Sequence, residues 1–327
     1  MKPVDDYGDP SSSLIPGGVA APDSDKNEHK ITPVPEGVRS ERSAHPKSVL
    51  LDGVKLYLFE PFDTRVFWVG QEMVLRLLIA SWLRPHPLDR SMTPVLVGPP
   101  GCGKTTLARF AASQFGRPVY TMNCTADMRP EDLLVMTVLS PTEKFRYQAS
   151  SLVSAMITGG ICILDEGNRM PERSWASLAP LLDDRRYVES VAAGMRIHAH
   201  PDFRLVVTMN DDSSTFNLPD YIVSRLKPVL PVSFPERDEL IQILAYHFPR
   251  LENALAVAIV EHLTARKESG TLDDYSIRDA INIAELTLHL EKNRDDALTP
   301  EELVAQNARY IVKPAEEDRR DSRFRLM

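Results

Sequence analysis

The feature that most constrains the fold of this 327-residue chain is a glycine-rich stretch at residues 98–105. Its sequence, Gly-Pro-Pro-Gly-Cys-Gly-Lys-Thr, fits the pattern G-x-x-x-x-G-K-[ST]. An apolar run precedes it and a helical pattern follows it, so it lies where a strand should turn into a helix. Glycines there let backbone N–H groups converge on phosphate oxygens, and the helix N-terminus adds partial positive charge. The stretch predicts an α/β fold with a phosphate site at a strand end.

This loop and the start of its helix supply the predicted nucleotide contacts. We expect Lys104 to contact the β- and γ-phosphates and the Thr105 hydroxyl to ligate Mg²⁺. A glycine turn with an incidental lysine is the alternative. The predicted nucleotide-binding residues of this segment are Gly98, Pro99, Pro100, Gly101, Cys102, Gly103, Lys104, Thr105 and Thr106.

Two adjacent acids end the apolar run at residues 161–166, Ile-Cys-Ile-Leu-Asp-Glu. Two carboxylates at the end of an apolar strand are costly unless a cation lies there. Mg²⁺ would supply that charge for Asp165, and Glu166 would orient or deprotonate an attacking water. A solvated helix cap would explain one acid but not both. With the glycine-rich loop, the pair predicts nucleoside triphosphate hydrolysis.

The identity of the nucleotide follows from what else the sequence carries. A GTPase needs a guanine-reading NKxD element after a strand, and the sequence has none. A small-molecule kinase remains an alternative, although it would not usually carry a water-activating glutamate. We therefore predict ATP and Mg²⁺ as the ligands.

The pattern of apolar residues divides the chain into two kinds of region. Near-continuous apolar runs at 94–98, 118–122, 161–165 and 203–209 alternate with helical stretches, which is typical of a parallel sheet covered on both faces. After Pro235 only helical patterns remain. Two of these start with capping signals, Ser276 to Asp279 and Thr299 to Glu302. We predict an α/β domain at 48–235 and a helical domain at 236–313.

The two ends of the chain have a different composition. Residues 1–47 hold seven of the 26 prolines and one aromatic residue, Tyr7, so they cannot bury enough apolar surface to order themselves. We predict a disordered N-terminal tail at 1–47, with partner recognition as the alternative role. Residues 314–327 are predicted to be a charged C-terminal tail.

Charge and cysteine content limit the class of protein. Lys and Arg total 38 against 46 Asp and Glu, a net charge of −8, which disfavours coating of nucleic acid but leaves a local basic groove open. Three cysteines without a CxxC pair indicate a reducing compartment. The N-terminus lacks the apolar core of a secretory signal, and the longest apolar run is too short to span a bilayer. We predict a soluble, cytoplasmic protein.

The order of the motifs resembles that of the AAA+ ATPases, in particular their MoxR-like and dynein-related branch. The resemblance covers roughly residues 50–290 and includes Val69-Gly70-Gln71, the loop at 98–105, and the segments 165–171, 181–188 and 206–211. It implies a P-loop AAA+ three-layer αβα sandwich with a parallel sheet, followed by a small all-helical lid domain. It also implies that residues 185–202 form a β-hairpin facing the pore or a partner.

The resemblance implies roles for two asparagines near the predicted acids. Asn210 matches the sensor-1 residue, whose amide holds the attacking water or the γ-phosphate. Asn123 takes the place of the residue that restrains the catalytic glutamate in many AAA+ proteins. A turn-forming asparagine at a strand end is the alternative for both.

The resemblance also implies roles for two arginines. Arg225 looks like the arginine finger, which is presented to the nucleotide of the neighbouring subunit. The family usually has an aromatic residue next, whereas Leu226 and Lys227 follow here, which leaves open whether Lys227 shares the role. Arg278 matches sensor 2, a cation that reaches the γ-phosphate from the lid. A surface salt bridge and a solvated side chain are the respective alternatives.

At the level of the whole protein, the resemblance implies a homo-oligomeric ring, a hexamer, that remodels or matures a protein client or complex. A protein with a von Willebrand factor A domain is the implied partner in trans. Two alternatives stay open: a nucleic-acid translocating subunit of a restriction-type complex, and a nucleotide-switched binding module with little turnover.

Overall fold

The computed structural model describes seven segments of the chain. They are residues 47–62, 65–86, 89–140, 144–211, 218–269, 275–290 and 298–312. Both predicted tails lie outside these residues, apart from Lys47. In the described part of the chain no helix is long and apolar enough to cross a membrane.

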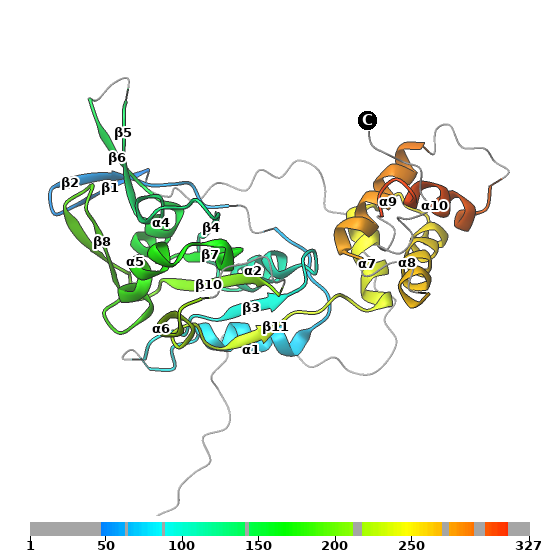
Figure 1. Cartoon of the computed structure of the whole chain (residues 1–327), viewed down its shortest axis with the longest axis horizontal. Helices are drawn as coiled ribbons and strands as arrows, with labels where there is room; N and C mark the ends of the chain where they lie inside the picture. The colour runs from blue at the N-terminus through cyan, green and yellow to red at the C-terminus, as the bar shows by residue number, and fades with distance from the viewer. Residues whose placement is uncertain are drawn as a thin grey trace, which may run out of the picture. The chain divides into compact units, whose positions relative to one another are not determined.

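A five-stranded parallel sheet forms the centre of the α/β region, in the order β11-β3-β10-β7-β4 (Figure 1). Each strand pair in it is parallel, and the register places Asn210 opposite Gly98 and Asn123 opposite Asp165. The carboxyl ends of the central strands therefore meet at one edge. The strands are β3 (Val95–Gly98), β4 (Val119–Asn123), β7 (Ile161–Asp165), β10 (Arg204–Asn210) and β11 (Val229–Pro231).

Helices pack on both faces of this sheet because its strands alternate their side chains between two cores. In β7, Ile161 and Ile163 belong to the core that contains α1 (Glu72–Trp82) and α2 (Lys104–Ser113). Cys162 and Leu164 belong to the other core, with α4 (Ser151–Thr158) and α5 (Glu172–Leu182). The predicted three-layer αβα arrangement is confirmed.

Two smaller β structures accompany the main sheet. The hairpin of β8 (Tyr187–Ser190) and β9 (Met195–His198) lies within the predicted hairpin segment. A four-stranded sheet that the sequence did not predict has the order β1-β2-β6-β5. Its strands are β1 (Ser48–Leu51), β2 (Val54–Tyr57), β5 (Val135–Val138) and β6 (Arg146–Ala149).

Three short helical turns lie in the loops of the α/β region. They are α3 (Pro130–Leu133), the 3₁₀ turn η1 (Gly167–Arg169) and α6 (Asp220–Val223). The turn η1 directly follows the predicted acid pair, and α6 lies just before Arg225.

The C-terminal described residues are helical and have a core of their own. Both predicted caps are present: Ser276 and Asp279 exchange hydrogen bonds before α9, and Thr299 and Glu302 do so before α10. In the described residues the last strand ends at Pro231, and only helices follow from Arg237 onward. The domain limits at 48–235 and 236–313 remain predictions. The helices are α7 (Arg237–His247), α8 (Asn253–Glu268), α9 (Ile277–Leu290) and α10 (Pro300–Ala308).

Candidate functional site

The glycine-rich loop joins β3 to α2, as the sequence predicted. Gly101 and Gly103 have φ values of 81° and 95°, in the left-handed region that favours glycine. A Cβ on Gly98 would lie 2.0 Å from the Val232 carbonyl oxygen, so no larger residue fits without a backbone shift. Gly103 lies directly before the first turn of α2, which aims the helix N-terminus at the loop.

Lys104 lies inside this loop. Its side chain is buried, and its Nζ donates to the carbonyl oxygens of Gly98 and Pro99 at 2.9 and 2.8 Å. In the described residues these contacts are to neutral carbonyls and not to a carboxylate. The ammonium charge of Lys104 therefore has no carboxylate partner among the described residues and is available to bind a phosphate at the loop.

Asp165 ends β7 and receives two hydroxyl groups. Thr105 Oγ1, from the first turn of α2, donates to Asp165 Oδ1 at 2.6 Å. Thr208 Oγ1, from β10, donates to the same oxygen. The Thr208 hydroxyl also accepts a 3.0 Å hydrogen bond from the Glu166 backbone N–H, so it ties the two acids to the neighbouring strand.

Thr208 was not among the predicted site residues. It is fully buried, and it lies two residues before Asn210 on the same strand. Residues two apart on a strand share a face, so this spacing is the signal that could have identified it.

Glu166 lies just past the strand, in a left-handed conformation with φ of 56°. Asn210 Nδ2 lies 3.4 Å from Glu166 Oε1, and Arg169 Nε lies 2.7 Å from Glu166 Oε2. Among the described residues, Asn210 and Arg169 contact this carboxylate and the predicted partner Asn123 does not. Asn123 is exposed, and it lies opposite Asp165 as a backbone partner in the parallel pairing of β4 and β7.

Cys124 lies beside the acid pair, and its N–H donates to the Asp165 carbonyl at 2.8 Å. Burial, together with the nearby charges of Asp165 and Glu166, raises the pKa of Cys124 to about 12. The thiol is therefore protonated at neutral pH and is not a nucleophile for this site.

Arg225 lies apart from these groups. Its Nη1 donates to the Tyr221 carbonyl, and its Nη2 lies 3.6 Å from Asp183 Oδ2, at the end of α5. Its Nε is buried and has no hydrogen-bond partner within the described ranges. In the described part of the chain, Arg225 contacts α5 and α6 and none of the phosphate-loop residues.

Arg278 lies in the first turn of α9, where its side chain is exposed. Its neighbour Ile277 donates its N–H to the Gly101 carbonyl at 3.2 Å. A Cβ on Gly101 would lie 2.3 Å from Ser276 Cβ. The start of α9 therefore touches the phosphate loop, and Arg278 directly follows the residue that donates to it.

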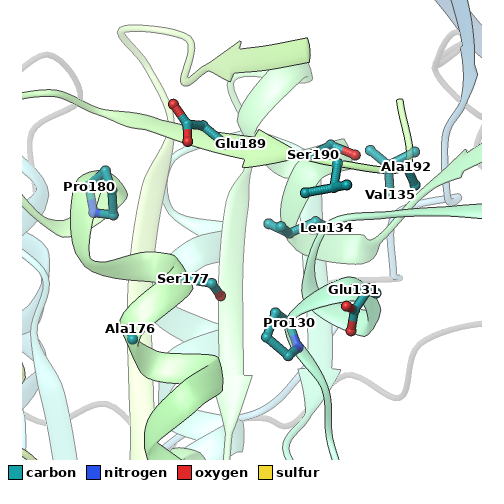
Figure 2. A pocket seen from close by; sticks show the side chains of 11 residues that line it. Pro130, Glu131, Leu134, Val135, Ala176, Ser177, Pro180, Glu189, Ser190 and Ala192 are labelled. Atoms are coloured by element: carbon teal, nitrogen blue, oxygen red, sulfur yellow. The ribbon is translucent and has the colours of Figure 1, made fainter. Parts of the chain in front are cut away.

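A pocket of about 320 Å³ lies elsewhere in the α/β region, between α3, α5 and β8 (Figure 2). Figure 2 shows Pro130 and Leu134 on one wall and Ala176 and Pro180 on α5. None of the predicted site residues lines it, so it is separate from the phosphate loop.

Comparison with known proteins agrees with this arrangement. Residues 94–226 match the family described as "AAA domain (dynein-related subfamily)". These residues form an AAA domain of the dynein-related subfamily. The match confirms the resemblance to the MoxR-like and dynein-related branch, and the AAA domain contains the phosphate loop, both acids, Asn210 and Arg225.

Three curated relatives resemble part of this chain in sequence. Protein CbbQ from Hydrogenophilus thermoluteolus is 35% identical over 116 residues, which are 36% of this chain and 43% of CbbQ. Protein NorQ from Paracoccus denitrificans is 35% identical over 46% of this chain and 57% of NorQ. The denitrification regulatory protein NirQ from Pseudomonas aeruginosa is 36% identical over 45% of this chain and 54% of NirQ. The chain thus spans about half the length of these relatives.

Solved structures with the same fold include two mutant forms of RuvB from Thermotoga maritima. Each has a TM-score of 0.50 and 21% identity, and the likeness covers 73% of this chain and 69% or 70% of RuvB. At this identity the likeness shows the fold alone.

The residues of the AAA domain fit a magnesium ion. The Thr105 hydroxyl and the Asp165 carboxylate lie within hydrogen-bond distance of each other at the start of α2. Mg²⁺ prefers oxygen ligands and usually takes one or two from the protein and the rest from phosphates and waters. The oxygen pair at this position provides that set.

Proposed function

We propose that this protein binds ATP at the phosphate loop and hydrolyses it. The observation that carries the proposal is the meeting of three groups at one sheet edge: the Lys104 loop, the Thr105–Asp165 pair and the Glu166–Asn210 pair. The AAA domain match supports it, because this fold is built for nucleotide binding.

In the proposed reaction, Lys104 exchanges its carbonyl partners for the β- and γ-phosphates. Thr105 and Asp165 would hold Mg²⁺, which would neutralise phosphate charge there. Glu166 accepts a proton from the attacking water as that water bonds to the γ-phosphorus and the bond to ADP breaks. The Asn210 amide orients the same water, and its contact with Glu166 supports this role.

We further propose that the active form is a ring of identical subunits, a hexamer. Arg225 lies away from the phosphate loop of its own chain, as a finger that serves the neighbouring subunit would. Arg278 adds a second cation from the helical region, next to the Gly101 contact.

The work that hydrolysis drives is the remodelling or maturation of a protein client or complex in the cytoplasm. One relative supports an action on other proteins, since NirQ is named a denitrification regulatory protein. A partner with a von Willebrand factor A domain is the proposed link to the client.

Mixing two inactive variants tests this proposal. Arg225→Ala lacks the finger but keeps its phosphate loop, whereas Lys104→Ala lacks the loop lysine but keeps its finger. We expect each alone to release almost no phosphate from ATP, because a finger in trans contributes roughly 10³-fold or more to the rate. We expect an equal mixture to recover a measurable part of the rate.

Two controls make this test specific. Lys227→Ala mixed with Lys104→Ala shows whether the neighbouring lysine shares the role of the finger, and we expect Lys227→Ala alone to remain active. No recovery in the Arg225 mixture, when size-exclusion chromatography shows that both variants co-assemble, would remove Arg225 as the finger.

A further inference from the structure

Asp183, at the C-terminal end of α5, lies between two arginines. Arg185 holds it tightly: Nε lies 3.1 Å from Oδ1, Nη2 lies 2.8 Å from Oδ2, and the backbone N–H of Arg185 lies 3.0 Å from Oδ1. Arg225 holds it loosely, with Nη2 at 3.6 Å from Oδ2. The Asp183 carboxylate is thus hydrogen-bonded to Arg185 and lies farther from Arg225.

The two distances have different physical meanings. Hydrogen bonds between charged groups measure about 2.7–2.9 Å, so the 3.6 Å contact of Arg225 is electrostatic attraction without a hydrogen bond. Arg185 occupies both carboxylate oxygens in a fork geometry. Its hydrogen bonds are the main reason that the pKa of Asp183 falls to about 2, and the charge of Arg225 adds a smaller part.

Arg225 is consequently oriented but incompletely satisfied. It donates to the Tyr221 carbonyl, its Nε is buried and has no partner among the described residues, and its side chain is 30% exposed. A phosphate would offer it charge-assisted hydrogen bonds that Asp183 does not supply. Leaving Asp183 costs little, because Arg185 still neutralises that carboxylate.

We propose that Asp183 is a positioning residue for the arginine finger and that Arg185 keeps Asp183 from capturing it. Attraction to Asp183 orients the Arg225 guanidinium on its own subunit, and the competing Arg185 leaves it free to move to a neighbour's phosphate. This inference rests on the proposed role of Arg225.

The role predicts an unusual pattern of mutant rates. Arg185→Ala leaves Asp183 with Arg225 as its remaining guanidinium partner, so the finger is captured and kcat falls, by about tenfold, with little change in KM. Asp183→Asn removes the attracting charge, and kcat falls by about threefold because orientation is lost. In the double variant nothing captures the finger, so kcat returns to the level of Asp183→Asn alone.

The measurement is ATP turnover by the full-length assembled protein for the two single variants, the double variant and Arg173→Ala. Arg173 is an exposed arginine on α5, and its removal controls for the loss of surface charge. We expect it to leave kcat unchanged. A double variant as slow as Arg185→Ala, or slower, would overturn the inference, since a merely structural ion pair cannot be rescued by removing its second half.

Two further variants keep the outcomes distinct. If Asp183→Asn unfolds below the assay temperature, Asp183→Ser is used in place of that variant, because it removes the same negative charge. Arg225→Ala separates the two proposals: a normal rate in that variant contradicts the finger role itself. Loss of its rate, combined with no rescue in the double variant, contradicts the inference about Asp183 alone.

Discussion

The acidic and hydroxyl groups of the candidate site are joined to one another by hydrogen bonds, whereas its two arginines, Arg225 and Arg278, lie outside that network in the described residues. Thr105, Asp165, Thr208, Glu166 and Asn210 form one connected set of hydrogen bonds within a single chain. Arg225 and Arg278 have no such connection, since the first is held by α5 and α6 and the second is exposed at the start of α9. Under the proposed function, folding alone completes the half formed by these hydrogen bonds, and assembly of subunits and movement of the helical region complete the half that supplies the two arginines.

The physical reason lies in charge and solvation. The half-buried Asp165 carboxylate accepts from two hydroxyls, and Glu166 is paired with Arg169, so both acids have partners on their own chain. A guanidinium aimed at an empty phosphate site would lack a counter-charge there. Arg225 has such a counter-charge in Asp183, whose Oδ2 lies 3.6 Å from its Nη2.

The largest effect should come from Lys104, which directly precedes Thr105 of the completed half. In Lys104→Ala the loop loses its buried ammonium, and we expect ATP binding to be undetectable by calorimetry at concentrations that saturate the wild type. Lys55→Ala, which removes an exposed lysine on β2, is the matched control and should bind normally. Unchanged ATP affinity in Lys104→Ala would mean that Lys104 does not hold the phosphates, and the division of the site into these two halves would be wrong.

A smaller effect is expected from the base of the completed half. Glu166→Gln should lower turnover by about 10²–10⁴-fold, the usual contribution of a general base, while ATP remains bound. We expect bound ATP to be retained and the oligomer to be stabilised, which phosphate release and size-exclusion chromatography measure together.

The control for this variant is Glu172→Gln, which changes an exposed acid in the first turn of α5. It should have the wild-type rate. Turnover by Glu166→Gln at that same rate would assign the base to another residue.

The smallest effect concerns the buried hydroxyl that links the acids. Thr208→Val keeps the shape but leaves the Glu166 N–H without its partner, at a cost of about 1–3 kcal/mol in the free energy of unfolding. Thr287→Val is the comparison, because Thr287 is also buried and hydrogen-bonded but lies in α9. Urea denaturation should show both losses, whereas the rate of ATP hydrolysis should fall only in Thr208→Val. Equal rates in the two variants would argue against a link between Thr208 and the acids' function.

Local sequence signals predicted much of the α/β region. The run at 161–165 is β7 to the residue, and both predicted helix caps are present, because alternation, apolar runs and caps are properties of adjacent residues. The four-stranded sheet escaped prediction for the opposite reason. Its central pairing joins Leu56 to Tyr147, 91 positions on, and each of its strands has only four residues.

The contacts of Glu166 show the same division. Its presence at the strand end follows from sequence, but its partner Arg169 does not. Arg169 meets the carboxylate because the left-handed Glu166 and the turn η1 bring the chain back on itself. The family resemblance indicated Asn123 instead, whose side chain is exposed at the end of β4.

The sequence by itself determined the phosphate loop, the acid pair and the alternation of strands and helices, because each depends on neighbouring residues and on the period of apolar side chains. Only the tertiary structure decided that Thr208 joins the two acids, that Arg169 holds Glu166, and that Arg225 shares Asp183 with Arg185. Such contacts depend on strand order and on how the chain turns after each strand. Those are set by packing of the whole core, which no local pattern of residues encodes.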